Sequence, residues 1–109
     1  MDTIETIKGQ LSGNDVILYM KGTPQAPQCG FSARSVQALM SCGERFAFVN
    51  ILEHPEIREQ LKVYSNWPTF PQLYVKGELV GGCDIITEMF DNGELQPLIK
   101  EAVGSEQNS

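Results

Sequence analysis

The spacing of hydrophobic residues changes from one segment of the chain to the next, and it predicts an alternation of helices and strands. Near the amino terminus, Ile4, Ile7 and Leu11 recur at helical intervals, which predicts a short amphipathic helix. Residues 16–20 then form a continuous apolar run rich in β-forming residues. Such a run predicts a strand that is buried on both faces, as in the centre of an α/β sheet.

The helical pattern returns at Cys29, after a loop of residues 22–28 that contains two prolines. A glycine C-cap at Cys42-Gly43 is predicted to end this helix. Its predicted inner face consists of Phe31, Val36, Leu39 and Met40.

Residues 46–51 predict the next strand. Pro55 can then open a third helix in its first turn, where the missing N–H costs nothing. The segment 66–71, which contains two prolines, breaks regular structure. The predicted inner face of the third helix consists of Ile57, Leu61 and Tyr64.

Residues 72–75 and 78–80 predict two strands joined by a hairpin turn at Lys76-Gly77. Asp84 is a natural N-cap for the helix that follows, and the pattern from Leu95 to Val103 predicts a last helix.

This order of elements predicts an α/β fold. The early strand–helix–strand units imply parallel pairing by right-handed crossovers, and the late hairpin adds antiparallel strands. The result is a four-stranded mixed sheet flanked by helices on both faces. We expect residues 1–104 to form this single domain and residues 105–109 to be a disordered tail.

Composition narrows the class of protein. A net charge of −6 over 109 residues argues against a surface for nucleic acid or anionic membranes, because such surfaces need basic patches. No apolar run is long enough to cross a bilayer, and the start lacks the pattern of a secretory signal. The three cysteines include no C-x-x-C pair, which favours a reducing compartment, and we predict a cytoplasmic location.

Cys29 is the strongest candidate for chemistry because it lies between a loop and a predicted helix. Backbone N–H groups and the positive end of the helix dipole stabilise a thiolate there, and Lys21 can add a positive charge. The alternative is an inert, buried cysteine that packs as a small hydrophobe. In Cys29-Gly30-Phe31-Ser32 a serine occupies the second position of a C-x-x-C spacing, so an external thiol has to resolve any mixed disulfide on Cys29.

Three further features predict a groove for a short peptide with two anionic ends, an amine and a thiol. Prolines bracket Thr69-Phe70, so this loop offers backbone groups to an extended peptide or is simply rigid. N–H groups in Gly81-Gly82-Cys83-Asp84 suit a carboxylate, with capping by the aspartate as the alternative. Lys21 and Arg58 hold another carboxylate or are ordinary surface charges.

The other cysteines and the single histidine have structural interpretations. Packing of Cys83 under the last helix, with only its N–H used, is favoured over a ligand role for its side chain. Cys42 lies at a helix C-terminus, where the dipole disfavours a thiolate. His54 has no cluster of ligands around it, which favours a surface residue over a metal ligand.

Three motifs together resemble those of a CGFS-type monothiol glutaredoxin of the short, single-domain bacterial kind. They are K-G-T-P-Q-A-P-Q-C-G-F-S at residues 21–32, W-P-T-F-P-Q-L at 67–73 and G-G-C-D-I at 81–85. The resemblance extends from the first helix to Val103, so the domain of residues 1–104 would be a glutaredoxin domain. It implies a thioredoxin fold and a bound glutathione.

The resemblance also implies roles for individual residues. Cys29 would be the thiol that meets glutathione or iron, and Pro71 would be a cis proline. The residues implied to bind glutathione are Lys21, Arg58, Phe70, Cys83 and Asp84. The first two would pair with its glycine carboxylate, the backbone of Phe70 with its cysteine part, and the last two with its γ-glutamyl end.

Two functions follow from these residues. We favour an iron–sulfur carrier: a 2Fe-2S cluster usually needs four thiolates, and two chains that each give Cys29 and one glutathione supply four. The resemblance implies this bridged homodimer, a heterodimer with a BolA-type protein, and transfer to apo iron–sulfur proteins with the cluster assembly machinery, in cluster biogenesis and iron homeostasis. The alternative is a glutathione-dependent thiol–disulfide oxidoreductase that acts through Cys29, and we expect at most weak activity of that kind.

Overall fold

The structure, a computed structural model, describes residues 2–107 of the chain. Its central element is β1 (Val16–Met20), whose five residues are all buried, as the apolar run predicts. The sheet has four strands in the order β4-β1-β5-β6, so β1 has a neighbour on each side. The other strands are β4 (Ala47–Asn50), β5 (Gln72–Val75) and β6 (Glu78–Gly81).

The directions of the strands confirm the predicted mixed sheet. β4 is parallel to β1, whereas β5 is antiparallel to β1 and to β6. The turn between β5 and β6 has positive φ at both Lys76 (52°) and Gly77 (81°). These angles belong to a type I′ turn, whose twist matches that of the flanking strands, so the predicted hairpin is confirmed.

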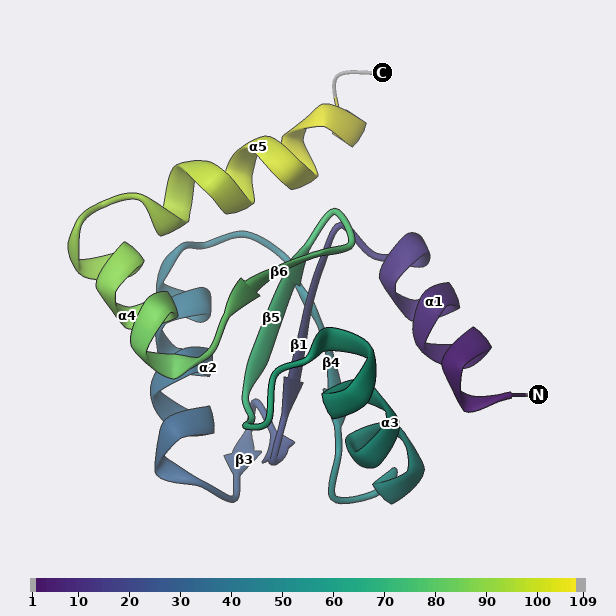
Figure 1. The fold of residues 1–109 in the computed structure, drawn as a ribbon. Helices are drawn as coiled ribbons and strands as arrows, with labels where there is room; N and C mark the ends of the chain where they lie inside the picture. Colours follow the sequence, from purple (N-terminus) through teal and green to yellow (C-terminus); the bar gives the residue numbers. More distant parts are fainter. Residues whose placement is uncertain (1, 108–109) are drawn as a thin grey trace.

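Five helices among the described residues cover the two faces of the sheet, which confirms the predicted layers (Figure 1). α1 and α3 cover one face, and α2, α4 and α5 cover the other. Their bounds are α1 Thr3–Gly13, α2 Gly30–Ser41, α3 Pro55–Ser65, α4 Cys83–Asp91 and α5 Leu95–Gln107.

Each face of the sheet has its own hydrophobic core because side chains alternate along β1. Leu18 points toward α2, α4 and α5, where it joins Leu39 and Ile99. Tyr19 points the other way and packs with Ile7 of α1 and residues of α3. The strand between them is therefore held from both sides, and its carboxyl end, which leads to Cys29, is fixed in position.

Some predicted core residues are exposed. Phe31 and Met40 are 54% and 58% exposed, and Tyr64 is 43% exposed, so their assignment to inner faces is wrong. α2 packs against the sheet through a narrower stripe that includes Val36 and Leu39. Phe31 and Met40 lie beside this stripe.

Three boundaries also differ from the predictions. The loop of residues 22–28 contains a small antiparallel ribbon, β2 (Gly22–Thr23) with β3 (Ala26–Pro27). α4 begins at Cys83 with Gly82 as its N-cap, so the assignment of the N-cap to Asp84 is wrong by two residues. α5 continues to Gln107, so it includes three residues of the predicted tail of 105–109. The polar residues of that segment are compatible with a helix. Residues 108 and 109 lie outside the described residues.

Candidate functional site

Cys29 is the N-cap of α2, so the prediction of a cysteine at a helix start is confirmed. Its exposure is intermediate, and it lines a cavity. The pKa of its thiol is lowered from the ordinary value, first by the backbone N–H of Ser32 and further by that of Phe31, by the Ser32 hydroxyl and by the charge of Lys21, while partial burial acts in the opposite direction. This is the environment of a reactive cysteine.

Ser32 joins the end of β1 to the start of α2. Its side chain is fully buried, and its hydroxyl oxygen accepts a hydrogen bond of 3.1 Å from the backbone N–H of Lys21. The carbonyl of Lys21 in turn accepts from the N–H of Gln28 at 2.9 Å. The backbone of Lys21 is therefore bound on both sides, which sets the starting point of its side chain beside Cys29.

Asn50, at the end of β4, fixes the ribbon that lies between Lys21 and Cys29. Its side-chain oxygen accepts from the N–H of Gly22 at 2.9 Å and from the N–H of Leu52 at 3.0 Å. A single carboxamide thereby ties the first residue of β2 to the loop after β4. The ribbon is held to the sheet at its base rather than only by its own short pairing.

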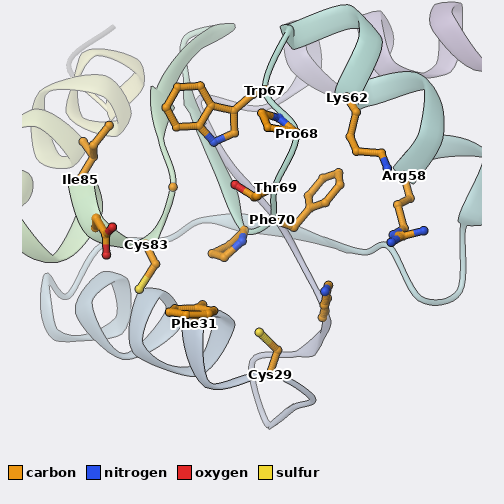
Figure 2. Close-up of a pocket in the computed structure, with 14 residues that line it drawn as sticks. Cys29, Phe31, Arg58, Lys62, Trp67, Pro68, Thr69, Phe70, Cys83 and Ile85 are labelled. Atoms are coloured by element: carbon orange, nitrogen blue, oxygen red, sulfur yellow. The ribbon is translucent and has the colours of Figure 1, made fainter.

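The opposite wall of the cavity is the loop of residues 67–71. The Phe70–Pro71 peptide bond is cis, as the resemblance predicts. The side chain of Phe70 is 8% exposed and belongs to the core on the α1 and α3 face. Phe70 also lines the cavity, and Figure 2 shows its loop across the cavity from Cys29.

The amino end of α4 forms a third wall. Gly82 is its N-cap, and no side chain caps the first turn. The N–H groups of this turn therefore remain available to an anion, as expected for a helix N-terminus. Cys83 is 8% exposed, in agreement with its expected packed position, and its sulfur still borders the cavity (Figure 2).

One cavity of about 540 Å³ brings all six predicted site residues together. This volume is in the range of small-molecule sites. The six residues come from the end of β1, the start of α2, the helices α3 and α4 and the loop before β5, so the fold assembles them. They are Lys21, Cys29, Arg58, Phe70, Cys83 and Asp84.

The cavity also has lining residues outside the predicted set of six. Trp67 and Thr69 belong to the loop opposite Cys29, and Lys62 lies one helical turn after Arg58 on α3 (Figure 2). Trp67 and Thr69 belong to the W-P-T-F-P-Q-L motif, which could have indicated them. Lys62 could have been found from its i, i+4 spacing to Arg58, because residues with this spacing lie on the same face of a helix. Phe31 and Ile85 complete the apolar part of the rim.

Charge is divided across the cavity. Lys21, Arg58 and Lys62 lie on the side of β1 and α3, and Asp84 lies on the side of α4. Arg58 and Lys62 both contact the carboxylate of Glu59, at 3.0 and 3.5 Å. The cationic side suits a carboxylate of a ligand, and the anionic side suits an ammonium group.

The remaining cysteine is structural. Cys42 is 6% exposed, and its thiol donates a hydrogen bond of 3.4 Å to the carbonyl of Ala38. Burial raises the pKa of the Cys42 thiol, and the charge of Glu44 raises it further, which confirms the expected contrast with Cys29. Within the described part of the chain, no group of three or more His, Cys, Asp or Glu side chains is placed to hold a metal ion.

The fold and the site together define a thioredoxin-fold protein with one reactive cysteine at a helix start. A family model described as glutaredoxin matches residues 16–80, more than half of the chain. The chain belongs to the glutaredoxin family, and its C-G-F-S sequence places it among the monothiol members.

Relatives and solved structures agree with this assignment. Glutaredoxin 4 of Escherichia coli K12 is 65% identical over 99 residues, which cover 91% of this chain and 86% of the relative. Glutaredoxin 4 of Haemophilus influenzae is 58% identical over 101 residues, covering 93% and 94% of the two chains. The solution structure of reduced poplar apo GrxS14 has 49% identity and a TM-score of 0.78, with 92% of each chain covered.

None of the helices formed by residues 2–107 combines the length and the apolar character that a membrane span requires.

Proposed function

We propose that this monothiol glutaredoxin binds glutathione and carries a 2Fe-2S cluster shared between two chains, as an iron–sulfur carrier in cluster biogenesis and iron homeostasis. The observation that carries the proposal is the contrast among the three thiols. Cys29 is partly exposed, lines the cavity and has a lowered pKa, whereas Cys42 and Cys83 are buried. The chain offers one ligand, and Ser32 supplies no second one.

Glutathione fits the walls of the cavity. It has two carboxylates, one ammonium group and one thiol, and the cavity has cations on one side and a free helix start with Asp84 on the other. In this arrangement Lys21 and Arg58 pair with the glycine carboxylate and the main chain of Phe70 pairs with the cysteine part. Cys83, through its N–H, and Asp84 hold the γ-glutamyl end.

The donor set fits a cluster only if it is shared. Four thiolates are the usual requirement, and among the described residues of one chain Cys29 is the accessible thiol, because the other two cysteines are buried. Two chains and two glutathione molecules complete the set, which makes the cluster a cargo held between protomers. The same proposal includes a heterodimer in which a BolA-type protein replaces one protomer. It also includes apo iron–sulfur proteins as recipients of the cluster, the cluster assembly machinery as a partner, and a cytoplasmic location.

Anaerobic reconstitution with iron, sulfide and glutathione tests this function. The expected product is a coloured dimer on size-exclusion chromatography, with Cys29→Ser colourless and monomeric. Cys42→Ser serves as the matched control and should form the coloured dimer. A colourless, monomeric wild-type protein would contradict the carrier function.

A second function is favoured by the lowered pKa of Cys29, since a thiolate is the attacking species in disulfide exchange. The Cys29 thiolate would attack the glutathione sulfur of a mixed disulfide, forming a Cys29–glutathione disulfide and releasing the protein thiolate. A glutathione thiolate would then attack that disulfide, releasing oxidised glutathione and regenerating Cys29. Brisk turnover of a glutathionylated substrate by the colourless monomer would favour this oxidoreductase.

A further inference from the structure

Gln72 is a fully buried polar residue to which neither the family's site residues nor the proposed function gives a role. It is the first residue of β5 and directly follows Pro71. Its backbone lies opposite Tyr19 of β1 in the sheet. A carboxamide at this depth is costly unless its donors and its acceptor are all used, so its partners are informative.

The donors of Gln72 bind the loop that faces Cys29. Its Nε2 donates to the carbonyl of Trp67 at 3.0 Å and to the carbonyl of Thr69 at 3.2 Å. These two carbonyls precede Phe70 by three residues and by one. One buried side chain thus holds the loop at two points before Phe70, and Phe70 itself lines the cavity.

The acceptor of Gln72 is bound as well, which fixes the orientation of the carboxamide. Tyr74 lies two residues further along β5, so its side chain is on the same face, and its Oη donates to Oε1 of Gln72 at 2.9 Å. The ring of Tyr74 packs edge-on against that of Tyr19, with 5.6 Å between centroids. With Oε1 occupied, Nε2 is directed at the loop.

The other contacts of the loop lie at its start and against α4: the N–H of Trp67 donates to the carbonyl of Lys62 at 3.3 Å. The indole Nε1 of Trp67 is buried and has no hydrogen-bond partner within the described residues, so this side chain contributes packing alone. On the far side, a Cβ added to Gly82 would lie 3.2 Å from the carbonyl of Pro71 and 3.5 Å from that Nε1. The loop therefore packs closely against the start of α4, and a shift of the loop would displace both walls of the cavity.

We propose that Gln72 is a positioning residue for ligand binding: its carboxamide holds the Trp67–Pro71 loop so that the main chain of Phe70 faces the Cys29 thiol. The part of this inference that concerns affinity rests on the proposed binding of glutathione. The part that concerns the loop does not, and it is tested without any ligand. The two parts have separate readouts.

Trp67 is the only tryptophan of the chain, and it lies in the loop that Gln72 holds. Its fluorescence therefore reports on this loop alone. In Gln72→Met and Gln72→Glu, which both remove the two donors, the acrylamide quenching constant of Trp67 should rise about twofold under native conditions. Tyr19→Phe is the matched control: it removes a tyrosine hydroxyl that is bonded to Gln10, leaves all three hydrogen bonds of Gln72 in place and should change the constant far less.

The glutathione dissociation constant, measured by calorimetry, gives the second readout. It should rise roughly fivefold to tenfold in the Gln72 variants, because the loop must then be ordered on binding. Alkylation of Cys29 by iodoacetamide should keep its wild-type rate, since none of the described hydrogen bonds links Gln72 to Cys29. If wild-type protein binds no glutathione, the proposed function fails while the loop inference stands on the quenching data.

A measurement on wild-type protein covers the case in which the Gln72 variants do not fold. The side-chain amide protons of Gln72 should exchange with solvent much more slowly than those of the exposed Gln37 and Gln60. Equal exchange rates, or a folded Gln72→Met whose Trp67 quenching and glutathione affinity match those of wild type, would overturn the inference.

Discussion

Gly22 is the position at which a single methyl group should disturb the site most directly. It is the first residue of the ribbon between Lys21 and Cys29, and its φ is +95°, a conformation that side chains rarely adopt. A Cβ at this position would lie 2.6 Å from the carbonyl oxygen of Ala26 and 2.7 Å from the backbone nitrogen of Gln28. Because both are main-chain atoms, one in β3 and one directly after it, neither can rotate away.

The expected loss of stability in Gly22→Ala follows from two costs. The left-handed conformation costs an alanine about 1–2 kcal/mol, and forcing atoms into an occupied space costs about 1–3 kcal/mol. The sum of about 2–5 kcal/mol is a large part of the roughly 5–15 kcal/mol that stabilises a domain. For a chain of this size it corresponds to a fall in melting temperature of roughly 8 °C or more.

Urea unfolding followed by far-UV circular dichroism measures this loss, and Gly30→Ala is the control. Gly30 also adjoins Cys29, but its φ is ordinary and a Cβ there would have no atom within 4 Å. Its replacement should leave the free energy of unfolding within about 1 kcal/mol of wild type, in the stabilising direction. A loss of less than about 1 kcal/mol in Gly22→Ala would refute the reasoning, since the ribbon would then relax around the methyl group.

Further predictions concern the thiols and the cationic side of the cavity. The alkylation rate of Cys29 should rise with pH at a lower midpoint than that of an ordinary cysteine, and Ser32→Ala should move the midpoint upward. Because the folded-state pKa of Cys29 is depressed, wild type should gain stability over Cys29→Ser as pH rises toward the pKa of an unfolded thiol, and lose that gain as pH falls. Arg58→Ala should weaken glutathione binding by roughly threefold to tenfold, less at high salt, whereas Lys100→Ala on α5 should not, as calorimetry at two ionic strengths would show. Cys42→Ala should cost about 1 kcal/mol in urea unfolding and leave the absorption spectrum of the reconstituted cluster unchanged.

The order of elements could be predicted because periodicity in this chain is strong where burial is strong. The run from Val16 to Met20 is buried throughout, and the positions that α1 buries, Ile7 and Leu11, have helical spacing. The ribbon within residues 22–28 could not be predicted, because it has no such periodic pattern. Its strands have two residues each and include a proline, so they are too short to show an alternation. The hydrogen bond from Gly22 to Asn50 ties the ribbon to the sheet instead.

The exposed apolar residues show what periodicity cannot decide. Phe31 has the spacing of a core residue, yet it is on the rim of the cavity, where its ring lies 5.2 Å from the guanidinium of Arg34. A sequence pattern gives the face of a helix but not the width of the stripe that a sheet covers. Residues at the edge of that stripe are therefore uncertain until the neighbouring helix is placed.

Site residues could be predicted where they belong to a motif or carry a charge. They were harder to predict where a residue acts through hydrogen bonds to main-chain groups. Lys21, Cys29 and Asp84 carry their chemistry in the side chain, and the cavity contains all three. The contribution of Gln72 is invisible in the sequence because it depends on which two carbonyls approach its carboxamide. Only the folded loop brings the carbonyls of Trp67 and Thr69 within reach of one side chain.

Ser32 shows that the missing second thiol is part of the construction of the site. A thiol at this position would be a weaker and longer hydrogen-bonding partner for the N–H of Lys21 than the hydroxyl, which is buried and accepts at 3.1 Å. The same hydroxyl and the N–H of Ser32 both lower the pKa of Cys29. Ser32 thus binds the end of β1, stabilises the Cys29 thiolate and forms no disulfide with it. These three effects together lower the pKa of the Cys29 thiol, hold the main chain beside it and leave it without a disulfide partner at position 32.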